Sequence, residues 1–145
     1  MTRVLLSASA LLTAALLLSG CESSEANVEE SAPPGGSVLL GELSFPFSIS
    51  TCLNNPALGP QQFVIFGGGT ATDGRPFDVH ADGQRGRIEL RIKGESGSAA
   101  AIYTASFEPG MLQLQSGAVS ADGLFQRIVG GGRIDGHFEA RCPTS

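Results

Sequence analysis

The sequence predicts an all-β domain: a small antiparallel β-sandwich or barrel of about eight strands, stapled by one disulfide. From residue 38 onward the apolar residues show no sustained 3.6-residue period, and strand-length runs are separated by glycine and proline. Asp-Gly occurs four times, at 73–74, 82–83, 122–123 and 135–136. Because this dipeptide supplies the positive φ angles of tight turns, we expect hairpins to dominate the topology.

Residues 1–20 are predicted to be a secretory signal peptide. Arg3 gives a positive start, and residues 4–18 form an uncharged run of apolar and small residues. This run is roughly five residues shorter than the 20 that a spanning helix needs, and acidic residues follow soon after it. A cleaved export signal is therefore favoured over a permanent transmembrane segment.

Leu18, Ser19, Gly20 and Cys21 close this run and resemble the lipobox of bacterial lipoproteins. The resemblance implies that the sulfur of Cys21 carries a diacylglycerol, that the signal is cut before Cys21, and that the new amino terminus is acylated. Each buried CH₂ group contributes about 0.8 kcal/mol, so two or three acyl chains would hold the protein durably on a membrane. A disulfide partner for Cys21 is the alternative, but three cysteines always leave one unpaired, and the lipobox accounts for it.

The lipidated cysteine and a disordered tether are expected over residues 21–37. Residues 22–37 contain four Glu, no basic residue and no aromatic residue, so this stretch cannot bury enough apolar surface to fold. As a flexible chain it spans roughly 20 to 25 Å root-mean-square. The β-domain, expected over 38–145, holds ten acidic and eight basic residues, a net charge of −2.

Alternation of apolar and polar residues predicts the strands of this domain and the direction of their side chains. The expected strands cover residues 38–45, 47–52, 62–66, 75–83, 86–94, 100–107, 111–115, 124–129 and 135–142. The clearest inward positions are Phe77, Val79, Ala81, Ile88, Leu90, Ile92, Phe138, Ala140 and Cys142.

Cys52 and Cys142 remain once Cys21 is lipidated, and an exported domain lies where disulfides persist. We expect these two residues to form a disulfide that joins the last strand to an early one. A pair of buried free thiols is the alternative. Closing a loop of about 90 residues would contribute roughly 4 to 5 kcal/mol by restricting the unfolded chain.

Several stretches resemble the mycobacterial 19-kilodalton surface lipoproteins of the LpqH type: "LSGC", "SISTC", "VIFGGGTATDG", "SGAVSADGLFQRIVGGGRIDG" and "HFEARC". The likeness covers most of the mature chain, although the tether has Glu where that family favours Thr, Ser and Gly. It implies an envelope-anchored, non-enzymatic β-domain whose lipid end is sensed by host innate receptors.

Composition and motifs argue against several other functions. A net charge of −5 disfavours nucleic acid as a partner, and one Tyr with no Trp offers few flat surfaces for stacking. "GESGS" at 94–98 does not match the Gly-x-Ser-x-Gly nucleophile elbow, and "FGGGTATDG" lacks the Lys of a phosphate-binding loop. We therefore expect no enzymatic activity, no catalytic residue and no cofactor.

One set of side chains suggests a metal site. Strand alternation places Asp78, His80 and Asp82 on one outward face, and His137 and Glu139 on another. If these two strands were neighbours, the imidazole and carboxylate groups could bind Zn²⁺ or another divalent ion. The alternative, a solvated sheet face with Asp82 opening a turn, is favoured because the ligand spacing is not diagnostic.

These observations predict an exported, lipid-anchored cell-envelope lipoprotein that acts as a non-enzymatic binding or surface-display module. The anchor would hold it on the outer face of the bacterial cell membrane or on the envelope surface. The alternative is an envelope carrier with a lipid or other hydrophobic ligand in a cavity of the β-domain, for which the small residues at 99–101, 105 and 130–132 leave room. Besides the membrane, the candidate partners are a hydrophobic ligand, an envelope protein or a host protein.

Overall fold

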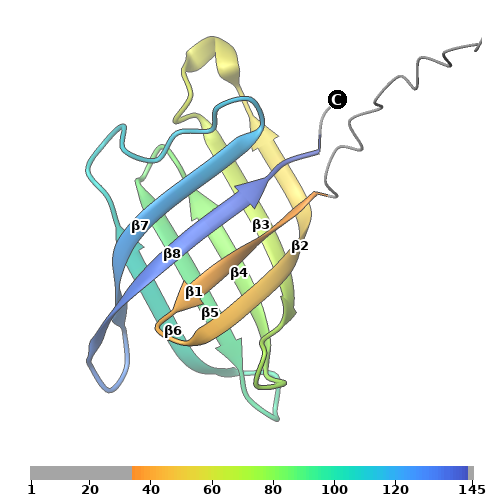
Figure 1. Ribbon diagram of the computed structural model, residues 1–145, viewed down its shortest axis with the longest axis vertical. Helices are drawn as coiled ribbons and strands as arrows, with labels where there is room; N and C mark the ends of the chain where they lie inside the picture. Colours follow the sequence, from red (N-terminus) through yellow and green to blue (C-terminus); the bar gives the residue numbers. More distant parts are fainter. Residues whose placement is uncertain (1–33, 144–145) are drawn as a thin grey trace, which may run out of the picture. The chain divides into compact units, whose positions relative to one another are not determined.

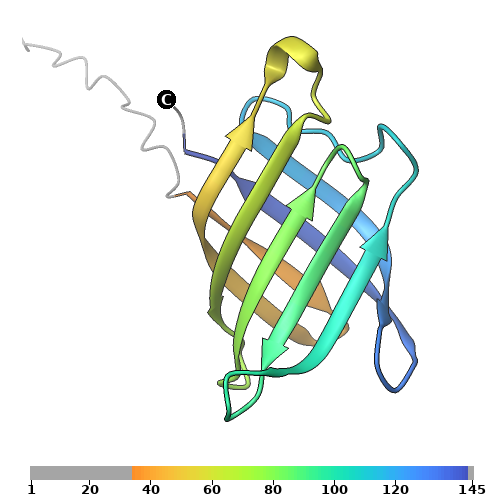
Figure 2. The same cartoon turned by 180° about the vertical axis from the view of Figure 1, so that it is seen from behind.

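The computed structural model describes residues 34–143; the expected signal peptide, Cys21 and most of the expected tether lie outside this range. The described chain forms a closed antiparallel barrel, in which each strand pairs with the next and β8 pairs back with β1 (Figures 1 and 2). The strands are β1 (Gly35–Leu40), β2 (Leu43–Asn54), β3 (Phe63–Thr70), β4 (Pro76–Asp82), β5 (Arg87–Lys93), β6 (Ala99–Ser106), β7 (Ala118–Arg127) and β8 (Arg133–Arg141). One short 3-10 helix, η1 (Pro56–Leu58), lies between β2 and β3. The predicted all-β fold and strand number are confirmed.

The inside of the barrel is filled by side chains that alternate along the strands. All nine inward positions predicted from the sequence are buried, and they belong to a core of 21 buried hydrophobic residues. Six phenylalanines give this core most of its bulk. They include Phe45 and Phe77, whose rings meet edge to face, and Phe47 and Phe138, whose rings are stacked. Such a barrel is small enough for its own side chains to occupy the interior.

The first strand ends earlier than the sequence suggested. Residues 38–45 were expected to form one strand, but the chain reverses at Gly41, whose φ of +59° favours glycine, and β2 then runs through Pro46 without a break. Pro46 lies opposite Ser37 in the β1–β2 pair. In addition, β1 begins at Gly35, so the last residues of the expected tether belong to the barrel.

Residues 111–115 were expected to be a strand and are instead part of the loop between β6 and β7. The apolar alternation that suggested the strand has a different cause. Leu112 is fully buried and Leu114 packs against the core, so the loop folds back onto the barrel. A loop that contributes core residues can show the same two-residue pattern as a strand.

Two of the four Asp-Gly pairs lie at turns, and two do not. Asp73 and Gly74 lie in the β3–β4 turn, where Arg75 donates a hydrogen bond to Asp73 and holds the pKa of that carboxyl below its usual value. Asp82 opens the β4–β5 turn and accepts a hydrogen bond from the backbone N–H of Arg85. The pairs at 122–123 and 135–136 were predicted wrongly: they lie inside β7 and β8.

Packing explains why the Asp-Gly pairs at 122–123 and 135–136 lie inside strands instead of at turns. Gly123 and Gly136 face each other across the β7–β8 pair. A Cβ atom on Gly136 would lie 2.6 Å from the ring of Phe125, so the glycine leaves space for a core aromatic rather than providing a turn conformation.

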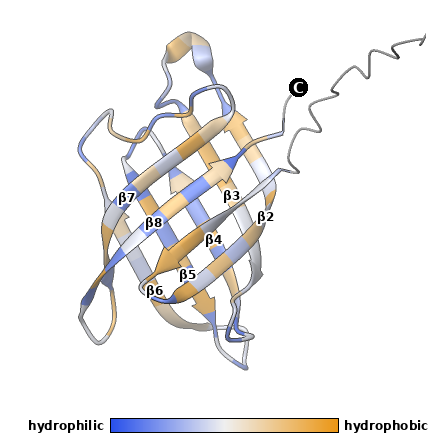
Figure 3. Ribbon diagram, viewed as in Figure 1, coloured by the Kyte–Doolittle hydropathy of each residue, from blue (hydrophilic) through white to orange (hydrophobic). Residues whose placement is uncertain are grey.

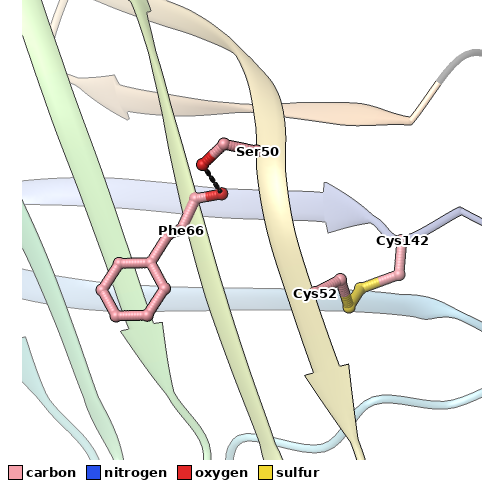
Figure 4. Close-up of a disulfide and its surroundings, with 4 residues drawn as sticks. All are labelled: Ser50, Cys52, Phe66 and Cys142. Atoms are coloured by element: carbon pink, nitrogen blue, oxygen red, sulfur yellow. Dashed lines mark hydrogen bonds between the residues drawn. A yellow bond between two sulfur atoms is a disulfide. The ribbon is translucent and has the colours of Figure 1, made fainter.

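The predicted disulfide joins Cys52 to Cys142, with their Cα atoms 5.9 Å apart (Figure 4). The first residue of β1, Gly35, pairs with Ser48 on one side and Arg141 on the other. Beyond this point β2 continues to Asn54, whereas β8 ends at Arg141, and the disulfide links β2 to Cys142, the first residue after β8. The bond therefore stabilises the barrel closure where ladder hydrogen bonds end.

A β-bulge directs Cys52 toward its partner. The register of β2 against β3 shifts between Ile49 and Thr51, and Ser50 donates a hydrogen bond from its hydroxyl to the carbonyl oxygen of Phe66, 3.1 Å away. Simple alternation from Phe47 would point the side chain of Cys52 outward. The extra residue of the bulge reverses the alternation, so that Cys52 points toward Cys142.

The two ends of the barrel carry different segments (Figure 1). We call the end at which β1 begins and β8 finishes the tether end; it also carries the loops 55–62, 83–86 and 107–117. The far end carries the turns 41–42, 71–75, 94–98 and 128–132. The expected Cys21 precedes Gly35 by 14 residues, so the chain from the lipid reaches the barrel at the tether end.

Candidate functional site

The outer face of β2 to β5 contains the first candidate site, which we call the aromatic groove. It has a volume of about 370 Å³. Its lining residues are Ser50, Phe66, Gly67, Asp78, Val79, His80, Glu89 and Arg91. On this face of β3 the next outward position after Phe66 is Gly68, which has no side chain to fill the space beside Asp78.

Phe66 distinguishes this face from the rest of the barrel surface. Of the eight phenylalanines, all within the described residues, seven are buried in the core or pack against it, whereas the side chain of Phe66 is 43% exposed. Its ring is stacked on that of His80, with centroids 4.4 Å apart and planes 5° from parallel. Phe66 and His80 are directly opposite in the β3–β4 pair, which fixes the stack on two rigid strands.

Charged residues border the stacked rings. Glu89, opposite His80 on β5, accepts hydrogen bonds from Arg87 at 3.0 Å and Arg91 at 2.9 Å. Asp78 pairs with Lys93 at 2.8 Å. Such exposed pairs contribute at most about 1 kcal/mol each to stability, so their main effect is to hold the guanidinium and carboxylate groups in place beside the rings.

A second polar cluster lies on the outer face of β7 and β8. His137 is 2.8 Å from Asp122 through Nδ1 and 3.4 Å from the hydroxyl of Ser120 through Nε2. The order of contacts is that of a Ser-His-Asp triad. However, the carboxylate that orients a catalytic histidine is normally buried, and the side chain of Asp122 is 90% exposed. Water therefore competes for both contacts of His137.

The structure separates the residues that suggested a metal site. His80 lies on β4 and His137 on β8, and three strands separate these two in either direction around the barrel. His80 stacks on Phe66, and Glu139 accepts a hydrogen bond from Ser37 at 3.1 Å. Within residues 34–143, no three His, Cys, Asp or Glu side chains gather closely enough to hold a metal ion. The condition for the site, neighbouring strands, is not met.

Sequence reasoning did not single out Phe66, Ser120 or Asp122. Alternation along residues 63–66 could have shown that Phe66 shares the outward face of Val64, opposite to Phe63 and Ile65. Asp122 was assigned to a turn, which concealed its position across from His137 in the β7–β8 pair.

Comparison with known proteins identifies no relative: no family model, no curated protein and no solved structure matches this chain. The likeness to LpqH-type lipoproteins therefore stays a prediction. In the part of the chain that the structure describes, no helix is long and apolar enough to cross a bilayer.

Proposed function

We propose that the protein is a lipid-anchored lipoprotein of the bacterial cell envelope, and that its barrel is a non-enzymatic binding or surface-display module. The observation that supports the binding or display role is a packed barrel with grooves on its outer face. A rigid scaffold of this kind presents fixed side chains to a partner without needing to open. The lipobox at Leu18 to Cys21 supports the anchor.

The aromatic groove is the surface that we propose for ligand contact. It combines one exposed phenylalanine with fixed carboxylate and guanidinium groups. These groups suit a ligand that has a flat apolar face and polar groups at its edge. The ring of Phe66 can pack against the apolar face, and Asp78 or Arg91 can form hydrogen bonds with the polar edge.

The alternative function, a carrier of a hydrophobic ligand, is supported by the short pairing between β6 and β7. β6 and β7 pair at only two positions, Tyr103 with Arg127 and Thr104 with Gln126. A ligand could enter there if the strands parted. The ring of Phe107, just after β6, packs beside Gly123 of β7 and occupies part of the seam between these two strands. Together with the packed core, this favours display.

The non-enzymatic character can be tested at Ser120. We expect a fluorophosphonate probe to leave Ser120 unmodified, because the 90% exposed Asp122 orients His137 only weakly. Intact mass after incubation would measure this, with a known serine hydrolase as positive control. Labelling of Ser120 that His137→Gln abolishes would make the protein a hydrolase.

The anchor can be tested by replacing the expected acylation site. In cells fed an alkyne-tagged palmitate, we expect the wild-type protein to be labelled and to sediment with membranes, and Cys21→Ser to lose both properties. Cys52→Ser and Cys142→Ser together are the matched control, since they remove the two disulfide-bonded cysteines and leave Cys21 in place. Membrane association of Cys21→Ser at the wild-type level would refute the anchor.

A further inference from the structure

Three large apolar side chains are exposed around the tether end of the barrel. Leu53 at the end of β2, Leu58 in η1 and Met111 in the 107–117 loop are 63%, 65% and 64% exposed. Leu53 and Leu58 line one shallow pocket, and the backbone N–H of Leu114 donates a hydrogen bond to the carbonyl oxygen of Pro60. The two longest loops are thus joined, and Figure 3 shows apolar colouring at the crown of the 55–62 loop.

The loops of the tether end carry few charged residues. Loops 55–62 and 107–117 contain one, Glu108, and Arg85 in the 83–86 turn forms an ion pair with Asp82 at the end of β4. The turns of the far end contain Glu42, Asp73, Arg75 and Glu95, and Arg127 and Arg133 flank the 128–132 turn. A surface with few charged groups loses little hydration when it enters the headgroup region of a bilayer, whereas charged groups lose more.

The length of chain before β1 favours the same orientation. The sequence predicts a flexible tether, and 14 residues of flexible chain, the number from Cys21 to Gly35, would have a root-mean-square span of roughly 20 Å. An eight-residue strand such as β3 is about 26 Å long. For the far end to approach the bilayer, the tether would have to pass along the full length of the barrel, whereas the tether end lies within its ordinary reach.

We infer that the tether end rests on the bilayer that holds the acyl chains of Cys21, with Leu58 and Met111 inserted among the lipid headgroups. This inference rests on the proposed lipid anchor. The aromatic groove, on the side of the barrel, stays open to the aqueous phase in this orientation. The competing apolar segment is the far-end turn with Ile128 and Val129, which are 55% and 70% exposed.

The chain has no Trp, so a single introduced Trp reports its own surroundings. We would prepare Leu58→Trp, Met111→Trp and Val129→Trp as processed, lipidated proteins that begin at Cys21. Each would be reconstituted into phosphatidylcholine vesicles with or without brominated acyl chains. Leu58→Trp and Met111→Trp are expected to emit at shorter wavelength and to lose about half of their emission to bromine, as for groups buried about 5–10 Å into the interface. Val129→Trp, the control at the far end, should keep its emission.

Each other outcome is decisive. If the proteins float with the vesicles but none of the three reporters is quenched, the docking is wrong and the anchor stands. Quenching of Val129→Trp to the level of Leu58→Trp would also overturn the inference, since no one end would then face the lipid. A wild-type protein that is not acylated and does not float with the vesicles would remove the proposed anchor, and the docking with it.

Discussion

Removal of the Cys52–Cys142 disulfide is expected to lower the free energy of unfolding by about 4–5 kcal/mol. The bond closes a loop with a sequence separation of 90, and the entropy that it removes from the unfolded chain grows with the length of that loop. Small domains have a total stability of about 5–15 kcal/mol, so this loss would leave the barrel marginal. The bond also joins β2 to Cys142, the first residue after β8, beyond the point at which β1 begins to lie between these two strands.

The measurement is urea unfolding of Cys21→Ala compared with Cys21→Ala/Cys52→Ala/Cys142→Ala. The shared Cys21→Ala background removes the lipid, so the two proteins differ only at the bridge. Wild-type protein treated with reductant should resemble the triple variant. An unfolding midpoint that does not change would show that the other ladder contacts alone close the barrel.

Phe138→Ala is expected to cost about 3–5 kcal/mol of stability. Phe138 is fully buried on β8, between Val38 of β1 and Ala121 of β7 in the register. Its ring is stacked on that of Phe47, with centroids 6.1 Å apart. Loss of the ring would leave a cavity at the closure of the barrel, because rigid strands on both sides limit relaxation.

Phe66→Ala is the matched control because it makes the same chemical change on the outer surface. Phe66 is 43% exposed, so its removal should cost no more than about 1 kcal/mol, mostly the stacking with His80. Thermal unfolding of both variants, followed by far-ultraviolet circular dichroism, would compare them. Equal losses in the two variants would contradict the packed interior on which the proposed display function depends.

The sequence predicts this fold well wherever one strand face is buried. In β5, Ile88, Leu90 and Ile92 alternate with charged residues. A strand with one buried face buries all three apolar side chains and leaves the charged ones in water. The same alternation predicts which side chains of β4 and β8 point into the barrel. The pairing of Cys52 with Cys142 followed from the number of cysteines and the expected compartment, not from geometry.

Other features depend on contacts that lie far apart in the sequence. Gly136 reads as a turn residue next to Asp135, but the ring of Phe125 on another strand requires a glycine there. The bulge near Ser50 is visible only once β3 is paired with β2. Likewise, His80 and His137 lie apart because of the strand order around the closed barrel, in which β1 pairs with β8. This long-range pairing cannot be predicted from a local sequence pattern.

Attachment to the membrane through Cys21 is the central claim, and the intact mass of protein extracted from membranes tests it most directly. The predicted mass is that of the chain from Cys21 to Ser145, less two hydrogens for the disulfide, with a diacylglyceryl group in place of the thiol hydrogen of Cys21 and an acyl group in place of one hydrogen of the new amino terminus. An unacylated chain that still begins at Met1 would contradict the account.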